Sequence, residues 1–246
     1  MRTKTAVALL VVLVFMMIGC SAKQKQSGPV TAVQHNPVPI SFKTISTNEI
    51  SISQSKQEWS ETKNIDLGTV DGKRTSIHLY SDGQIANAHA FIEHGGKSYN
   101  LGADYGNLGT VKNVKLEGSL GSVKLLFGIG TDLTAWTVVA YESGKIVTFE
   151  VLGLPEWIDL DKDGRGELVA SFEGGHLHPP NVEIIRFEEG KLESARVIDK
   201  TDAANPKVAL LEKQDAGNFI VIGKAREEKP LYNHYKYEKG QLVAVN

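Results

Sequence analysis

Short runs in which apolar and polar residues alternate dominate the chain after residue 60, and turns that contain glycine separate these runs. In Ser122–Ile129, for example, apolar side chains occupy every second position, which is the period-two pattern of a half-buried strand. No stretch after residue 60 shows a convincing 3.6-residue period. The pattern therefore predicts an all-β fold.

Four short strings that end in glycine recur along this part of the chain. They are Ile92–Gly95, Tyr141–Gly144, Phe187–Gly190 and Tyr237–Gly240, and their glutamates lie 49, 46 and 50 residues apart. Each string lies between two alternating runs, which is typical of a tight hairpin whose glycine adopts positive φ.

Two further strands are expected before each of these hairpins. The first of them are expected at Asn64–Leu67, Val114–Glu117, Trp157–Leu160 and Val208–Leu211. The second are expected at Thr75–Tyr80, Ser122–Ile129, Glu167–Phe172 and Asn218–Ile222. The chain is thus predicted to contain four tandem four-stranded antiparallel meanders, at about residues 60–107, 108–154, 155–203 and 204–246.

The length of these units fits the blade period of a β-propeller, in which each sheet buries its faces against its neighbours. We therefore expect a β-propeller-like domain over residues 60–246. The alternative is a sandwich in which similar hairpins recur by chance. The preceding segment, residues 38–59, includes Val38–Ile52, whose strand-like composition predicts that it seals the ring or covers an exposed sheet edge.

The first twenty residues predict export from the cytoplasm. Arg2 and Lys4 precede an unbroken apolar run, Ala6–Ile18, which is short for a bilayer span and typical of a signal peptide. The segment Met17–Ser21 resembles the bacterial lipobox and contains the only cysteine of the chain, Cys20. The alternatives are a cleaved signal peptide with an incidental cysteine, and an N-terminal anchor helix.

The lipobox resemblance implies that residues 1–19 are removed and that Cys20 is lipidated, with acyl chains such as palmitate. Residues 20–37 are polar and aperiodic, so they are expected to form a flexible tether. The protein is therefore expected to be extracytoplasmic, at the cell surface, and anchored to a bacterial membrane through its lipid.

Charge and cysteine content narrow the possible functions. The chain has 27 Lys and Arg residues and 29 Asp and Glu residues, so no basic field is present that would favour a nucleic-acid partner. One cysteine excludes both a disulfide framework and a cysteine-based zinc cluster. The sequence also has no Gly-x-Ser-x-Gly, His-Glu-x-x-His, P-loop or dinucleotide-binding motif, which favours a binding protein over an enzyme.

The strongest chemical signal lies in the third unit, after Trp157. Its candidate metal ligands are the carboxylates of Asp159, Asp161, Asp163 and Glu167 and the backbone carbonyl of Arg165. Oxygen ligands at alternating positions, with Gly164 allowing a sharp bend, suit Ca²⁺. An EF-hand is excluded, because Ala170 stands at the twelfth position and a strand follows the loop. The alternative is a solvated acidic turn.

This loop and its flanking strands resemble the calcium loop of FG-GAP/VCBS-type repeats, as in integrin α-chain propellers. In that family the loop joins the first two strands of a blade, so the resemblance implies one structural calcium at a blade corner. The Phe-Gly and Gly-Ala-Pro motif that names the family does not occur in register. The equivalent loops of the other units, Asp66–Gly72, Glu117–Gly121 and Glu212–Gly217, lack the full set of ligands.

A weaker candidate site contains His176 and His178, which lie two residues apart in a loop with two prolines. Two histidines at this spacing on an extended chain point the same way, and His89, His94 and His234 are candidates for a third metal ligand. A recognition loop is the favoured interpretation of this segment.

These observations predict an extracytoplasmic lipoprotein with one structural calcium that recognises a protein partner or a cell-envelope polymer. The alternative function is a propeller-type hydrolase that acts on glycans or phosphate esters at the cell surface, and a third is an assembly factor of the envelope. The sequence assigns no catalytic residue, and the fold alone does not choose among these functions.

Overall fold

The computed structural model describes residues 37–53, 59–81, 87–107, 110–131, 135–175, 178–199, 207–224 and 232–245. They all belong to one compact unit, His35–Asn246. Strands are the only extended regular elements among these residues, so the predicted all-β class is confirmed. The predicted signal peptide and Cys20 lie outside the described residues.

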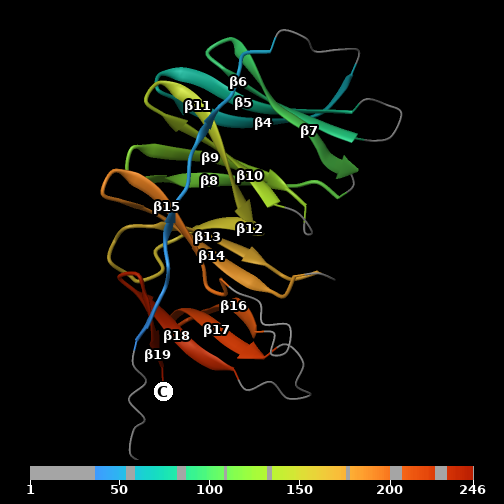
Figure 1. Ribbon diagram of the computed structural model, residues 1–246. Coiled ribbons are helices and arrows are strands. Elements are labelled where there is room, and N and C mark those ends of the chain that lie inside the picture. The colour runs from blue at the N-terminus through green and yellow to red at the C-terminus, as the bar shows by residue number, and fades with distance from the viewer. Residues whose placement is uncertain are drawn as a thin grey trace, which may run out of the picture. The chain divides into compact units, whose positions relative to one another are not determined.

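The strands form four antiparallel sheets, and four consecutive strands make up the body of each sheet (Figure 1). The first sheet contains β4 (Ser60–Val70), β5 (Lys73–Ser81), β6 (Asn87–His94) and β7 (Lys97–Asn107). The second contains β8 (Lys112–Leu120), β9 (Val123–Gly130), β10 (Ala135–Glu142) and β11 (Lys145–Leu152). The third contains β12 (Leu154–Ile158), β13 (Glu167–Phe172), β14 (Asn181–Glu188) and β15 (Lys191–Arg196). The fourth contains β16 (Lys207–Gln214), β17 (Gly217–Lys224), β18 (Asn233–Glu238) and β19 (Gln241–Ala244).

The glycine strings form the hairpins that the sequence predicts. In the last three sheets, a residue with φ of 48–49° precedes a glycine with φ of 78–86°. Two successive residues with positive φ form the turn whose twist matches two antiparallel strands. These turns are Ser143–Gly144, Glu189–Gly190 and Lys239–Gly240. The glycine in each string therefore marks the turn between the third and fourth strands of its sheet.

One predicted strand is displaced. The sequence pattern places the first strand of the third sheet at Trp157–Leu160, whereas β12 ends at Ile158. Leu160 does not extend the strand, because its backbone N–H donates to the carboxylate of Glu167 at 2.9 Å. The strand therefore ends where the acidic loop begins.

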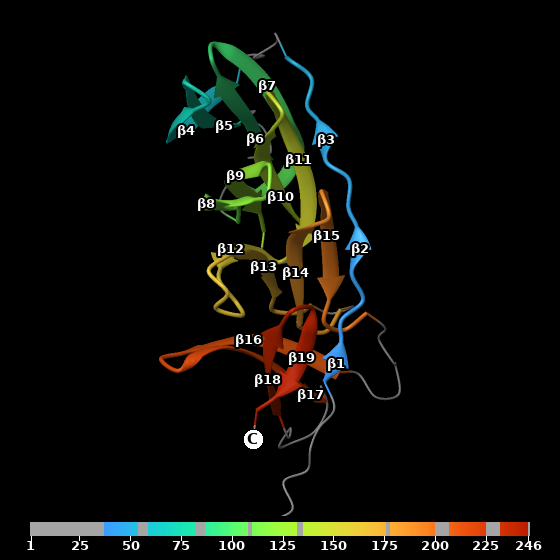
Figure 2. The same cartoon turned by 90° about the vertical axis from the view of Figure 1, so that its left-hand side faces the viewer.

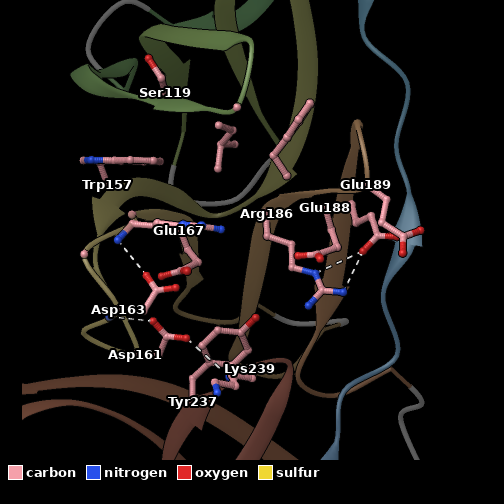
Figure 3. Close-up of a pocket in the computed structure, with 17 residues that line it drawn as sticks. Ser119, Trp157, Asp161, Asp163, Glu167, Arg186, Glu188, Glu189, Tyr237 and Lys239 are labelled. Atoms are coloured by element: carbon pink, nitrogen blue, oxygen red, sulfur yellow. Dashed lines mark hydrogen bonds and ion pairs between the residues drawn. The ribbon is translucent and has the colours of Figure 1, made fainter.

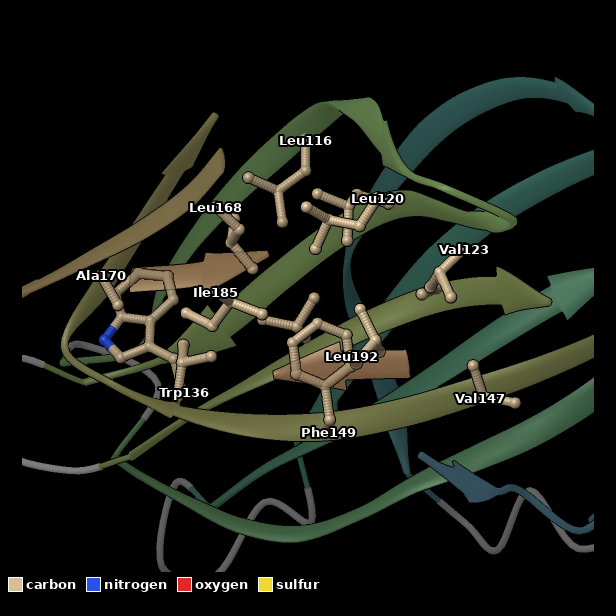
Figure 4. Packing of buried hydrophobic residues seen from close by; sticks show 14 residues of the cluster. Leu116, Leu120, Val123, Trp136, Val147, Phe149, Leu168, Ala170, Ile185 and Leu192 are labelled. Carbon is tan, nitrogen blue, oxygen red and sulfur yellow. The ribbon is translucent and has the colours of Figure 1, made fainter. Parts of the chain in front are cut away.

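Buried hydrophobic clusters join each sheet to the next one along the chain. One cluster joins the first and second sheets, and Phe127 and Ile92 are fully buried in it. The next joins the second and third sheets around Trp136, Phe149 and Leu168 (Figure 4). A third joins the third and fourth sheets. We call these three interfaces the first, second and third seams.

Because the two middle sheets contribute to two seams each, their central strands are buried on both faces. All residues of β9 except Lys124 are buried, and β13 has only Ser171 partly exposed. A strand that is covered on both faces has a nearly continuous apolar sequence, which obscures strict alternation.

Two glycines allow aromatic rings to cross the second seam. The ring of Trp157 lies against Gly118, and the ring of Phe187 lies against Gly121. A Cβ atom would lie 2.3 Å from the indole at the first position and 2.1 Å from the phenyl ring at the second. These contacts fix the spacing of the second and third sheets on the side that carries the acidic loop.

Closure into a propeller is not detected. No buried hydrophobic cluster in the described residues joins the first sheet to the fourth. The structure therefore contains four antiparallel sheets that pack in chain order. It does not show the closed ring that the repeat pattern predicts.

The segment Val38–Ser53, which we call the strap, covers one edge of all four sheets (Figure 2). Its first strand, β1 (Val38–Pro39), pairs with β19, and β2 (Lys43–Thr44) pairs with β15. The strand β3 (Asn48–Glu49) pairs with β11, and Ile52 forms a bridge to Tyr99 in β7. The strap thus meets the sheets in reverse chain order. This arrangement confirms that the segment covers a sheet edge.

Three isoleucines with a spacing of five residues attach the strap. The N–H groups of Ile40, Ile45 and Ile50 donate to the carbonyl groups of Gly240, Leu192 and Ile146 at 3.2, 3.0 and 3.3 Å. Their side chains pack against the third, second and first seams, respectively. Each isoleucine therefore closes the seam between two neighbouring sheets at its outer edge.

The opposite edge of the sheets is formed by β4, β8, β12 and β16. Register shifts interrupt β4 at Glu61/Lys63 and Asp66/Gly68, and another interrupts β8 at Lys115/Gly118. Bulges and charged side chains reduce the tendency of an open edge to pair with another strand. The two edges are thus protected differently, one by the strap along all four sheets and the other by bulges in β4 and β8.

The strap yields the first prediction. We expect Ile45→Ala to lower the free energy of unfolding by about 1–3 kcal/mol, because the side chain packs into the second seam. Val38 lies in the same strap but is 46% exposed, so Val38→Ala should change the free energy by less than about 0.5 kcal/mol. Urea denaturation of both variants measures the difference. Equal losses would show that the isoleucine spacing has no energetic role.

Candidate metal site

The acidic loop between β12 and β13 is held by its own carboxylates. Asp159 Oδ2 accepts from the N–H of Gly164 at 3.1 Å, and Asp161 Oδ1 accepts from the N–H of Asp163 at 3.2 Å. Asp163 Oδ1 accepts from the N–H of Arg165 at 2.7 Å. Gly164 has φ of 85°, which supplies the bend expected at this position. The loop thus turns its backbone around a common centre.

Three of the four predicted carboxylates meet at this centre. Ligand oxygens of Asp159, Asp161 and Glu167 lie within 4.8 Å of one another. Glu167 is 7% exposed, and Asp159 Oδ1 is buried with no hydrogen-bond partner. Asp163 is not part of this group of three, and its Oδ1 accepts from the N–H of Arg165.

The electrostatics of the group are unfavourable without a cation. Burial and, to a smaller extent, the charges of the neighbouring aspartates raise the pKa of Glu167 from 4.5 to about 7. The hydrogen bond from the N–H of Leu160 acts in the opposite direction and lowers the pKa. A divalent cation would neutralise the converging charges and supply a partner for the buried oxygen of Asp159.

The donor set fits a hard cation. Ca²⁺ takes six to eight oxygen ligands at about 2.3–2.6 Å and binds carboxylates in monodentate or bidentate fashion. The three carboxylates of the group are oxygen donors of this kind, and they are carried by a loop that bends around them. An acidic cluster that could hold a metal ion is therefore present where the sequence analysis expects it.

The loop also connects the third sheet to the fourth. The ammonium group of Lys162 donates to the carbonyl of Ala216 at 3.2 Å, in the turn that precedes β17. The N–H of Lys239, in the last hairpin, lies 3.5 Å from Asp161 Oδ2. A cation bound by Asp161 would therefore stabilise a junction of two sheets as well as its own loop.

A cleft of about 1020 Å³ adjoins the carboxylates. Asp161, Asp163 and Glu167 lie on one side, and Glu188 and Glu189 lie on the other (Figure 3). The hairpin before β9 and the last hairpin complete the lining. The cleft is predominantly acidic, since six carboxylates and three cationic side chains line it. The cationic residues are Arg165, Arg186 and Lys239.

Arg186 links this cleft to the strap. Its Nε and Nη2 atoms donate to Glu193 Oε2 at 3.2 and 2.9 Å, and its guanidinium lies 3.9 Å from the centre of the Phe42 ring. Nearby, burial raises the pKa of Tyr237 to about 12, although the positive charge of Arg186 lowers it. The phenol therefore remains neutral and can act as a hydrogen-bond donor in the cleft at physiological pH.

Of the two histidines of the weaker candidate, His178 is among the described residues, and it is not part of the carboxylate group. His178 is exposed, and its carbonyl accepts from the N–H of Gly175 at 2.8 Å. His176 lies outside the described residues. A metal or recognition role for this loop stays a prediction.

Sequence reasoning missed the charged residues of the cleft, although it used the strings that contain them. Glu188 and Glu189 belong to the string Phe187–Gly190, and Lys239 belongs to Tyr237–Gly240. Both hairpins project toward the acidic loop. The turn positions of these strings therefore mark the repeat and also carry charged side chains of the cleft.

Comparison with known families, with curated proteins and with solved structures found no match for this chain. Among the described residues, no helix has the length and apolar character needed to cross a membrane. What is shown is therefore an all-β protein with four antiparallel sheets and an acidic cluster that could hold a metal ion.

The raised pKa of Glu167 gives the second prediction. A carboxyl whose pKa is raised by folding stabilises the protein most below its unfolded pKa of 4.5, and this contribution is lost as the pH rises through about 7. In the presence of a chelator, the melting temperature of the wild type should therefore fall between pH 5 and pH 8. Glu167→Gln should reduce this fall, because the amide carries no charge.

The matched control is Glu189→Gln, which changes an exposed glutamate of the same cleft. Its melting temperature should follow the wild type across the pH range. Parallel curves for the wild type and Glu167→Gln would contradict the assignment of the pH dependence to the buried carboxyl.

Proposed function

We propose that this protein is a calcium-binding recognition lipoprotein that is anchored to a bacterial membrane and acts outside the cytoplasm. The observation that carries the calcium assignment is the convergence of Asp159, Asp161 and Glu167, together with the buried oxygen of Asp159 that has no hydrogen-bond partner. Burying one carboxylate beside two others is costly unless a cation compensates the charge.

The position of the loop supports a relationship to FG-GAP/VCBS-type repeats. It joins β12 to β13, the first two strands of the third sheet, which is where those repeats carry their calcium loop. We propose that the four sheets are a divergent set of such repeats, arranged in a propeller-like manner. Asp163 then supports the loop from behind, and the carbonyl of Arg165 contributes a ligand.

The cleft beside the acidic loop is the proposed recognition surface. Its lining combines carboxylates that accept hydrogen bonds with Arg165 and Lys239, which donate them. Its volume is at the upper end of that of small-molecule sites, so it suits one segment of a larger partner. A protein loop or a cell-envelope polymer fits these dimensions.

The anchor is proposed from the N-terminal sequence. The apolar run Ala6–Ile18 and the lipobox-like segment Met17–Ser21 support export and lipidation at Cys20. With the acyl chains in the membrane, residues 21–37 would separate the strap from the lipid surface.

Calorimetry with Ca²⁺ tests the metal assignment. The wild type should bind one ion, and saturating Ca²⁺ at about 100 times the dissociation constant should stabilise the fold by about 2.7 kcal/mol. Asp161→Asn should weaken binding at least about tenfold, because it removes a charged ligand. Glu188→Gln, which changes a cleft residue outside the carboxylate group, should bind like the wild type. Negligible heat from the wild type would refute the calcium site.

Metabolic labelling with a palmitate analogue tests the anchor. The wild-type protein should incorporate the label and sediment with membranes, because Cys20 is the only cysteine of the chain. Cys20→Ser should abolish labelling and leave the export signal Ala6–Ile18 unchanged. Membrane association of an unlabelled wild type would instead favour an N-terminal anchor helix.

A further inference from the structure

A second polar cluster lies on the outer face of the first sheet, away from the acidic loop. Along β5, Ile77 and Leu79 point into the first seam. Their neighbours Ser76, His78 and Tyr80 alternate with them and therefore share the opposite face. In the described part of the chain, none of the three seams includes this face, because the first sheet contributes to the first seam through its inner side.

His78 is held on both sides of its ring. Its Nδ1 lies 3.2 Å from Glu61 Oε2, which belongs to the neighbouring strand β4. Its Nε2 lies 2.9 Å from the hydroxyl oxygen of Ser76. The side chain of His78 is only 9% exposed, and its ring lies beside that of Tyr80, with 6.4 Å between the ring centres.

The partners of His78 decide which nitrogen carries the proton. An ionised carboxylate only accepts hydrogen bonds, so Nδ1–H donates to Glu61. In neutral histidine Nε2 then carries the lone pair, and the hydroxyl of Ser76 donates to it. The histidine is therefore oriented by a carboxylate to act as a base toward a serine, which is the relation found in serine hydrolases.

Two charged residues stand next to the serine. Glu93 Oε2 lies 3.6 Å from His78 Nε2, so its charge would stabilise the imidazolium that forms when His78 takes a proton. Arg74 precedes Ser76 by two residues on the same strand, so both lie on the same face. The guanidinium of Arg74 lies 3.8 Å from the carboxylate of Asp66, and both side chains are exposed, so a substrate oxygen that develops negative charge would compete with Asp66 for this cation.

We propose that Ser76, His78 and Glu61 form a nucleophile–base–carboxylate triad that hydrolyses carboxylic esters. Ser76 is half-buried, so the substrate class that fits is a small acyl group, such as an acetyl ester, carried on a larger molecule. This activity is separate from calcium binding and does not depend on the proposed recognition function.

The reaction balances with water as the second substrate. The Ser76 oxygen forms a bond to the ester carbonyl carbon, and its proton passes to His78 Nε2. The bond from that carbon to the alcohol oxygen then breaks, and the alcohol leaves with the proton from His78. Water next attacks the acyl-serine by the same route and gives up one proton to His78. The free acid is released, and the Ser76 hydroxyl is restored.

A fluorophosphonate probe and 4-nitrophenyl acetate test the proposal on the purified full chain. The wild type should be labelled on the peptide that contains Ser76 and should hydrolyse the ester. Ser76→Ala should abolish that label. Glu61→Gln should reduce the rate of labelling at least about tenfold, because the neutral amide no longer stabilises the imidazolium. His78→Gln should reduce labelling at least about 100-fold.

Ser81→Ala, on the same strand but with its side chain on the other face, is the matched control and should be labelled like the wild type. Because His78 is buried, circular dichroism must show that each variant is folded. If His78→Gln unfolds, Glu61→Gln still tests the proposal, because Glu61 is partly exposed and its substitution should leave the fold intact. A wild type that takes no label at Ser76 would overturn the proposal. Equal labelling of the wild type and Glu61→Gln would also overturn it, because it would indicate acylation of an ordinary surface serine.

Discussion

Burial between neighbouring sheets is the interaction on which the whole structure depends. A four-stranded meander has two faces and no core of its own, so its apolar side chains are excluded from water only when another sheet covers them. The three seams meet this need in chain order, and the middle sheets are consequently apolar on both faces. The strap adds a second constraint, because Ile40, Ile45 and Ile50 connect across the seams at their outer edge.

The acidic loop is the place where this packing brings like charges together. Its buried member, Glu167, is the first residue of β13, so the pairing of that strand fixes the carboxylate beneath the loop. Asp159 and Asp161 are then directed toward it by the hydrogen bonds that their other oxygens accept from the loop backbone. The cluster is thus a product of strand pairing and loop closure together, and a change in either would separate its members.

Much of the fold could be predicted from the sequence, because local rules determine it. Alternation predicted the strands, and the glycine strings predicted the hairpins, since a turn with two positive φ values strongly selects its residues. Ring closure could not be predicted in this way, because it depends on how far each sheet rotates relative to the last. The end of β12 at Ile158 also escaped prediction, since a single hydrogen bond from Leu160 to Glu167 removes two residues from the strand.

In the candidate sites, too, local sequence patterns could be predicted, whereas contacts between distant residues could not. The spacing of the acidic residues predicted a cation loop, but which three carboxylates converge became visible only in the structure, where Asp163 lies outside the group. The sequence did not mark Ser76 and His78 as a candidate site, because two polar residues at a spacing of two are common in strands. Their third partner, Glu61, lies on another strand and contacts His78 only in the folded protein. The five-residue spacing of isoleucine is visible in the sequence of Val38–Ser53. It matches neither a helix nor a strand period, so it did not predict how the segment attaches to the sheets.

The reverse order of the strap has a consequence for biogenesis. Val38 pairs with Leu242, so the earliest strand of the domain finds its partner only in the last one to be synthesised. Ile50 and Ile45 meet their partners in β11 and at Leu192 of β15, which are synthesised earlier, whereas Ile40 must wait for the last hairpin. The final hairpin, Tyr237–Gly240, thus gives the strap its last anchoring point, and attachment can proceed from the first sheet toward the fourth as the chain grows. Completion of the chain thus becomes a checkpoint for sealing the fourth sheet, and a chain interrupted before β19 would leave β18 as an open edge.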